Sequence, residues 1–258
     1  MIDVAIIASI IPERFPLLRR SLVTWQQSIQ TSGLKADIFL YVNGAPLNEV
    51  LPYLPCGSCI QIEGQVERTG SHIFGYNYWY QAVKAKVYLF THGEILFPTT
   101  TIRTAFEAAT DDVFAAFKVF WLPQHMTDHL DDYDWQQPER LEQCEDIYRR
   151  DPKEKGEFYW NKDVRSRTDW QSTTTFAYNR ATAAKIFPFP DLGHQGFDDP
   201  AHAGFRQVLG IRNHTVMEPI LAHQWHPQTW NGDADKAVEE AVVLINELQE
   251  RLGLGIGG

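Results

Sequence analysis

The sequence predicts an α/β fold with a mostly parallel central sheet flanked by helices. Residues 4–11 and 38–42 are short apolar runs rich in β-branched residues, which is typical of strands buried on both faces. Between these runs, apolar residues recur with helical spacing over residues 17–29. A strand, a helix and a strand in this order form a parallel pair with a right-handed crossover. The length of 258 residues suits one domain of this class.

Turn residues set the bounds of these first elements. Pro12 ends the first strand, and Gly33 ends the helix. Asn43 and Gly44 form a turn signal that closes the second strand. The first βαβ unit is therefore bounded by residue types that favour those ends.

The same alternation continues less regularly to the end of the chain. We expect strands at 59–62, 87–90, 113–122, 173–178, 211–217 and 220–223, and helices at 73–84, 101–109, 181–186, 201–209 and 234–252. Residues 123–170 interrupt the pattern with a polar, aromatic segment that has few aliphatic residues. An insertion of this length in a compact domain is usually functional.

Composition excludes several classes of protein. The 23 Lys and Arg against 33 Asp and Glu give a net charge of −10, which disfavours nucleic acids and anionic membranes as partners, because both bind basic patches. Three cysteines, Cys56, Cys59 and Cys144, are too few for a disulfide framework. The spacing of Cys56 and Cys59 fits an incidental pair in a loop better than a redox pair or half a zinc site. The longest apolar stretches, of about eight residues, are too short to span a bilayer. With no basic leader before the first strand, we expect a cytoplasmic protein without an integral membrane segment.

A histidine and a glutamate flank one glycine directly after the predicted strand 87–90. Side chains two residues apart at a strand end point the same way, so His92 and Glu94 could chelate one cation, while Gly93 lets the backbone approach a phosphate. His223 and His226 follow another predicted strand end and would supply the further ligands that Mn²⁺ or Mg²⁺ needs. Each of these residues alone also fits a solvated loop or an ordinary core or surface imidazole.

Two more segments carry residues suited to chemistry. Asp198 and Asp199 come just before the predicted helix 201–209, where Asp199 fits both a general base and a helix N-cap. Gly70 and Gly75 lie near a helix start, where free N–H groups could face an anion. The motifs GxGxxG, GxxxxGKS/T and GxSxG do not occur, which disfavours a Rossmann dehydrogenase, a P-loop NTPase and a serine hydrolase.

In this order, the segments resemble the GT-A glycosyltransferases, most closely the family-2 type that uses nucleotide-activated sugars. The resemblance covers roughly residues 3–122 and 172–227. Four segments carry it: Ile6 to Arg14 for the first strand and proline turn, Tyr41 to Gly44 for the end of the second strand, Gly75 to Asn77 for the helix under the nucleotide, and Tyr88 to Pro98 for the strand, DxD motif and following proline.

The chain departs from this family at three places. The second strand ends in Asn43 and Gly44, where the family has a turn that contains an aspartate. His92 and Glu94 stand where the DxD motif has its aspartates, which is compatible with a divalent metal and also with a metal-independent or altered enzyme. The arginine that the family carries in the helix after its acidic pair has no match at Phe205, and Arg206 is displaced by one residue.

The resemblance implies a single GT-A domain over 1–258, with a nucleotide-sugar-binding half at 1–122, an acceptor-side half at 123–233 and a C-terminal helix at 234–252. It also implies an inverting transfer from a nucleotide-sugar donor to a hydroxyl of a glycan, a lipid-linked, a small-molecule or a peptide acceptor, assisted by Mn²⁺ or Mg²⁺. The catalytic residues would be Asp199 and Asp198, and the metal ligands Glu94, His92, His223 and His226. The donor would contact Ala8, Ser9, Ile10, Glu13, Asn43, Gly75, Asn77, His92 and Gly93.

Tryptophans gather in and beside the insertion, on the side where the acceptor would dock. They suit stacking on a sugar ring and equally the packing of a small subcore. These tryptophans are Trp121, Trp135, Trp160 and Trp170.

Two rival classes of protein stay open. One is a non-catalytic sugar- or nucleotide-binding relic of the fold, and the other is a histidine-rich metallohydrolase, against which the lack of HExxH and HxHxD speaks.

Overall fold

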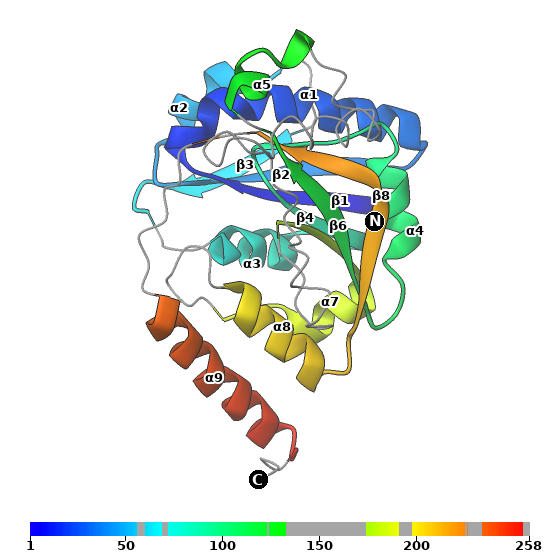
Figure 1. The fold of residues 1–258 in the computed structure, drawn as a ribbon, viewed down its shortest axis with the longest axis vertical. Helices are drawn as coiled ribbons and strands as arrows, with labels where there is room; N and C mark the ends of the chain where they lie inside the picture. The colour runs from blue at the N-terminus through cyan, green and yellow to red at the C-terminus, as the bar shows by residue number, and fades with distance from the viewer. Residues whose placement is uncertain are drawn as a thin grey trace, which may run out of the picture.

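The computed structural model describes residues 1–55, 60–68, 72–122, 124–132, 174–190, 198–224, 226 and 234–254. In this part of the chain, eight strands form one curled sheet in the order β3-β2-β1-β4-β7-β6-β8-β5 (Figure 1). Helices cover both faces of the sheet. This is the α/β architecture that the sequence predicts.

The described elements follow the predicted order along the chain. The strands are β1 (Ile2–Ile10), β2 (Ala36–Asn43), β3 (Ile60–Gln65), β4 (Ala85–His92), β5 (Ile95–Leu96), β6 (Val113–Trp121), β7 (Thr175–Asn179) and β8 (Arg212–His223). The helices are α1 (Phe15–Ser32), α2 (Leu47–Val50), α3 (Ile73–Ala82), α4 (Thr101–Ala108), α5 (Gln124–Asp128), α7 (Arg180–Ile186), α8 (Asp198–Val208) and α9 (Ala234–Arg251). Short 3-10 turns are η1 (Pro12–Arg14), η2 (Leu51–Tyr53) and η3 (Leu130–Asp132).

The sheet is mostly parallel. β1 pairs in parallel with β2 on one side and β4 on the other, so that Ile7 lies beside both Phe39 and Phe90. β3 continues this parallel set beyond β2, and β6 runs parallel to β8. Among the described strands, β7 and β5 run antiparallel to their neighbours. The predicted βαβ unit at the start of the chain is confirmed.

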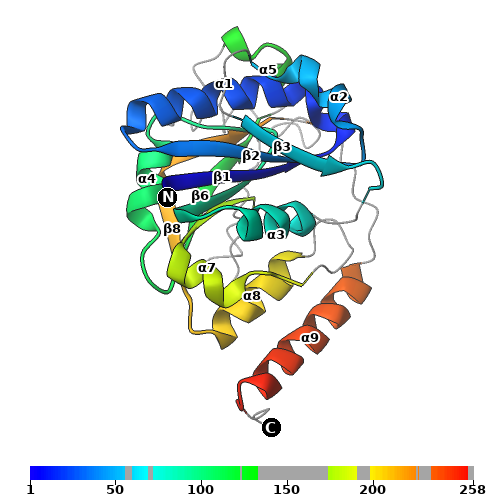
Figure 2. The same ribbon diagram turned by 180° about the vertical axis from the view of Figure 1, so that it is seen from behind.

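Two helical layers sandwich the sheet. Helices α1 and α4 pack on one face, and α3, α7 and α8 pack on the other, with α9 lying against α8 (Figures 1 and 2). The alternation in β1 assigns its side chains to the two layers, because Ile6 and Ile10 join the core under α1, while Ala5 and Ile7 join the core under α3. Both faces of β1 are buried, as its continuous apolar run predicts.

Helix α1 also holds the turn that follows β4. Gly33 ends α1 with a φ of 67°, the left-handed conformation that glycine adopts readily. Trp25 of α1 is fully buried, and its indole N–H donates a hydrogen bond of 2.7 Å to the carbonyl of Ile95. Because Ile95 directly follows Glu94, this bond fixes the backbone beside the predicted cation-binding residues.

The last strand, β8, differs from the prediction, which places two separate strands at 211–217 and 220–223. β8 is one strand, with an irregularity in its pairing: Val216 lies opposite Phe117, and Leu221 lies opposite Val119. Pro219 has no N–H for the ladder, and Glu218 beside it breaks the apolar alternation, so the sequence reads as two runs. The strand nevertheless continues to His223.

Several residues that the sequence analysis singles out lie outside the described ranges. The cysteines Cys56, Cys59 and Cys144, the tryptophans Trp135, Trp160 and Trp170, and the side chain of Trp121 lie outside the described residues. Within the described ranges, none of the helices has both the length and the apolar character that a membrane crossing requires.

Candidate functional site

The site lies at the carboxyl edge of the sheet, beyond β1 and β4. Strand β1 is the point where the order reverses, because β2 pairs on one side of it and β4 on the other. Ligands of open α/β sheets bind at such a switch point. β4 ends at His92, and the turn at Gly93 leads into β5, where Ile95 pairs with His223 at the end of β8. The sheet thus brings together histidines that lie far apart in the sequence.

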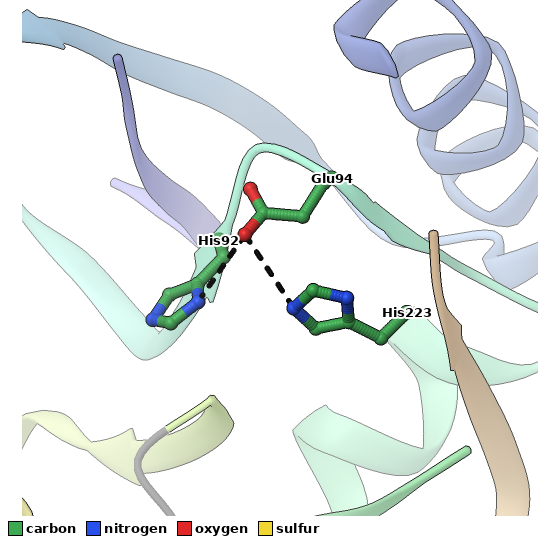
Figure 3. Close-up of side chains that lie close together, drawn as sticks. All are labelled: His92, Glu94 and His223. Carbon is green, nitrogen blue, oxygen red and sulfur yellow. Dashed lines mark ion pairs between the residues drawn. The ribbon is translucent and has the colours of Figure 1, made fainter. Parts of the chain in front are cut away.

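Glu94 is the centre of this cluster. Its side chain is fully buried, and its Oε1 atom forms an ion pair with the guanidinium of Arg14. The same oxygen lies 3.6 Å from Nδ1 of His92, 3.5 Å from Nε2 of His223 and 3.4 Å from Nε2 of His226. Figure 3 shows the carboxylate facing the rings of His92 and His223. Nitrogen atoms of four side chains therefore lie around this one oxygen atom.

Glu94 is ionised in this environment. Burial by itself raises the pKa of the carboxyl, but the pKa is held well below its usual range, and the positive charge of the Arg14 guanidinium is the largest effect that lowers it. The other carboxylate oxygen, Oε2, is buried and has no hydrogen-bond partner among the described residues. A buried, charged oxygen without a partner is costly, so it favours a ligand at this position.

The ring of His223 presents a lone pair to Glu94. Its Nδ1 lies 2.9 Å from the carbonyl oxygen of Gln224, and because a carbonyl accepts hydrogen bonds, Nδ1 carries the proton. Burial lowers the pKa of His223 to about 4, so the ring is neutral at pH 7 and Nε2 is unprotonated. Two electron-rich atoms, Nε2 and Oε1 of Glu94, thus face each other, and a cation between them would stabilise both.

His92, Glu94 and His223 could hold a metal ion. One ligand atom from each residue lies within 4.8 Å of the others. Metal-binding histidines commonly donate their second ring N–H to a backbone carbonyl, as His223 does. The three residues that the sequence placed at strand ends are therefore brought together with donors of a suitable kind.

The backbone around Glu94 is fixed on two sides. Its carbonyl accepts hydrogen bonds from the main-chain N–H of Gln224, at 3.2 Å, and from the side-chain amide of Gln224, at 3.1 Å. That amide also donates to the carbonyl of Leu17 in α1. On the other side, a Cβ atom at Gly93 would lie 2.4 Å from Cδ1 of Ile10, so no larger residue fits there without displacing Ile10.

Two residues of the cluster are additions to the sequence-based prediction. Arg14 ends η1, the proline turn directly after β1, and reaches Glu94. The ring of His72, just before α3, stacks on the ring of His92 with 4.3 Å between centroids. Burial, with nearby positive groups, lowers the pKa of His72 well below its usual value, so this ring is neutral. Both residues lie in segments that the sequence marks as turns, but their partners are distant in the chain.

The predicted donor-binding residues lie along the same edge in different settings. Ala8 and Ile10 pack in the core under α1, and Ser9 is buried, with no hydrogen-bond partner for its hydroxyl among the described residues. Glu13 is exposed and forms an ion pair with Arg68, with 2.7 Å between Oε1 and the guanidinium. Asn43 is buried at the end of β2, and Gly75 packs so closely on Tyr41 that a Cβ there would lie 2.7 Å from Cβ of Tyr41.

The amide of Asn77 forms hydrogen bonds within the fold. Its Nδ2 donates to the carbonyl of Phe189 at 2.6 Å, and its Oδ1 accepts from the N–H of Phe189 at 2.7 Å. This pair of bonds ties α3 to the segment after α7. Asn77 therefore has a structural role in addition to the donor contact that the sequence suggests.

Replacing Asn77 by alanine is expected to lower the free energy of unfolding by about 1–3 kcal/mol, because two buried backbone groups of Phe189 lose their partners. Urea denaturation measures this loss, with the exposed Gln61→Ala as the control expected to change stability by less than about 0.5 kcal/mol. Nucleotide affinity measured on the same variant tests the donor contact separately. An Asn77→Ala protein as stable as the wild type would contradict the structural role.

The predicted catalytic pair begins helix α8. Asp198 and Asp199 are its first two residues, which starts the helix three residues before the predicted position. Their side chains lie outside the described part of the structure. Farther along α8, Arg206 is buried, stacks on the ring of Phe114 at 3.7 Å and contacts Nδ1 of His202 at 2.6 Å.

Comparison with known proteins shows that this chain resembles a solved structure in its fold. No model of a known protein family and no curated protein sequence matches this chain. Among solved structures, it is similar to S. aureus TarS 1–349 in complex with UDP-GlcNAc, with a TM-score of 0.59 and 11% sequence identity. The match covers 95% of this chain and 66% of that chain, so this chain spans slightly less than two thirds of its neighbour. The fold is GT-A-like. The expected architecture is thereby confirmed.

Proposed function

We propose that this protein is a glycosyltransferase that moves a sugar from a nucleotide-sugar donor to an acceptor hydroxyl. The observation that carries the proposal is the cluster of His92, Glu94 and His223 at the switch point of a GT-A-like sheet. A structural neighbour of this fold was solved with UDP-GlcNAc, which supports a nucleotide sugar as the ligand class. A switch-point edge with polar residues is where such a ligand binds in open α/β sheets.

His92, Glu94 and His223 would hold a divalent cation, with His226 as a fourth ligand. Two or three imidazoles with one carboxylate suit Mn²⁺ better than Mg²⁺, which prefers oxygen ligands and retains its waters. A cation bound there would supply positive charge against the diphosphate that leaves when the glycosidic bond breaks. This charge also reconciles a protein of net charge −10 with an anionic donor.

The remaining steps fall to the chain's own residues. The donor would lie along the ends of β1, β2 and β4, near Ser9, Asn43 and Gly93. Asp199 would take the proton from the acceptor hydroxyl as that oxygen attacks the anomeric carbon, with Asp198 beside it. A single displacement of this kind inverts the anomeric centre. The residues from 123 onward would form the acceptor side, for a glycan, lipid-linked, small-molecule or peptide acceptor.

A thermal-shift panel tests the donor class. UDP-, GDP- and dTDP-sugars are each added to the protein with and without Mn²⁺. A true donor present at 100 times its Kd adds about 2.7 kcal/mol to the free energy of unfolding, which raises the melting temperature by roughly 5–10 °C in a chain of this size. We expect one nucleotide class to do so and Mn²⁺ to increase its effect. A panel in which no nucleotide sugar shifts the transition would contradict the proposal.

A binding protein without transferase activity is the second candidate. The observation that favours it is the replacement of the DxD aspartates by His92 and by a glutamate that Arg14 already neutralises. Incubation of the bound nucleotide sugar with the protein separates the two candidates, because glycosyltransferases commonly hydrolyse the donor slowly when no acceptor is present. Binding without release of the nucleoside diphosphate would support the binding protein.

A further inference from the structure

A second imidazole packs on the ring of His92. The ring of His72, the residue before α3, lies 4.3 Å from it between centroids, with 27° between the two planes. This separation is short for a pair of aromatic rings, so the two rings are in face contact. Nδ1 of His92 lies 3.6 Å from Oε1 of Glu94. Because Nδ1 lies in the plane of its ring, a ring that covers the face of His92 also restricts the direction in which Nδ1 points.

The first turn of α3 also fixes the backbone from which His92 extends. Tyr76 follows His72 by one helical turn and is 1% exposed. Its hydroxyl donates a hydrogen bond of 3.0 Å to the carbonyl of Thr91, the residue before His92. The hydroxyl of Thr91 in turn lies 2.9 Å from that of Thr175 in β7. Helix α3 therefore contacts the end of β4 twice, at the backbone and at the imidazole.

His72 contacts the metal-binding cluster without belonging to it. Among the described residues, the ligand atoms that lie within 4.8 Å of one another come from His92, Glu94 and His223. Nδ1 of His72 is buried and has no hydrogen-bond partner in the described part of the chain. The contact with His92 is therefore a stack of two flat rings and does not depend on a hydrogen bond from this nitrogen.

We propose that His72 is a positioning residue of the metal site, whose ring holds the imidazole of His92 in the orientation that faces Glu94. This role rests on the metal ligands of the proposed function and extends them by a residue outside the ligand set. A side chain that is already restrained loses less rotational freedom when it binds a ligand. Groups that orient metal-binding residues typically contribute 10–100-fold to metal affinity.

Two variants of His72 test this role. His72→Ala removes the ring, and calorimetry with Mn²⁺ is expected to show binding at least about tenfold weaker than in the wild type. His72→Phe keeps a flat ring and loses no described hydrogen bond of Nδ1, so it is expected to fold and to restore most of the lost affinity. If His72→Phe binds Mn²⁺ as weakly as His72→Ala, a nitrogen of His72 is required and the positioning role is overturned. Wild-type affinity in His72→Ala overturns it as well.

Tyr80→Ala is the matched control. Tyr80 lies in the same helix and also packs its ring on a residue of β4, Tyr88, with 5.1 Å between centroids, but away from the metal cluster. This variant is expected to lose stability in urea and to keep the Mn²⁺ affinity of the wild type. An equal loss of Mn²⁺ affinity in Tyr80→Ala and His72→Ala would mean that α3 is loosened as a whole, which overturns a specific role of His72.

Nuclear magnetic resonance of the metal-free protein tests the stack directly. The ring-proton signals of His92 are expected to move in His72→Ala and to stay in place in Tyr80→Ala, and signals that stay in place in both variants overturn the stack. A wild type that binds no Mn²⁺ refutes the metal site of the proposed function, and the positioning role with it. Mn²⁺ binding that is present in the wild type and unchanged in His72→Ala refutes the positioning role alone.

Discussion

Replacement of Glu94 by alanine is expected to abolish Mn²⁺ binding and to lower the free energy of unfolding by about 3–5 kcal/mol. The carboxylate is fully buried and pairs with Arg14, whose side chain is also largely buried. Removal of the carboxylate deprives the guanidinium of this buried ion-pair partner, which is strongly destabilising. The substitution also removes the one carboxylate of the cluster formed with His92 and His223. Urea denaturation in the presence of a chelator measures the first effect, and calorimetry with Mn²⁺ measures the second.

The matched control is Glu107→Ala. Glu107 also pairs with an arginine, Arg103, but the distance is 3.9 Å and the glutamate side chain is 66% exposed. An exposed pair of this kind contributes little, so the variant is expected to stay within about 0.5 kcal/mol of the wild type. If Glu94→Ala and Glu107→Ala destabilise the protein equally, the buried ion pair is not the structural centre that the contacts indicate. If Glu94→Ala still binds Mn²⁺ as tightly as the wild type, the metal ligands are elsewhere.

The fold was largely predictable from local sequence. β1, α1 and β2 follow from two apolar runs and one helical pattern, bounded by Pro12, Gly33 and the Asn43-Gly44 turn. The elements that the prediction missed lack such signals. β5 has two residues, which is too short for any periodicity, and it forms because β8 lies beside it. β8 itself is one strand in spite of Pro219, because pairing with β6 resumes beyond the irregularity.

The candidate site was predictable in part, for a related reason. His92 and Glu94 stand out because their spacing at a strand end is a local pattern, and His223 and His226 because they form a second local cluster. No local sequence pattern singles out Arg14, because its partner Glu94 lies 80 residues away in the chain. Its role depends on β1 and β4 being neighbours in the sheet, which the βαβ rule alone does not determine. Side chains that neutralise or orient the metal-binding residues can therefore be identified only once the fold is known.

Replacement of Asp199 by asparagine is expected to slow sugar transfer by roughly 10²–10⁴-fold while leaving the affinity for the donor unchanged. The asparagine side chain has nearly the same size but cannot accept a proton from the acceptor hydroxyl. Asp199 is the second residue of α8, where a carboxylate also interacts with the helix dipole. Loss of that interaction costs about 0.3–1 kcal/mol, so the folded protein is expected to remain available for assay.

This substitution separates the two roles that the sequence leaves open for Asp199. A purely structural role in the first turn predicts a small loss of stability with normal turnover, whereas a general base predicts a collapse of kcat in addition to that small loss. Asp198→Asn is the matched variant, because it makes the same charge change one residue earlier in α8. Turnover that falls in Asp198→Asn but not in Asp199→Asn would move the base to Asp198. Normal turnover in both variants would mean that neither aspartate takes the proton, and that another residue must do so.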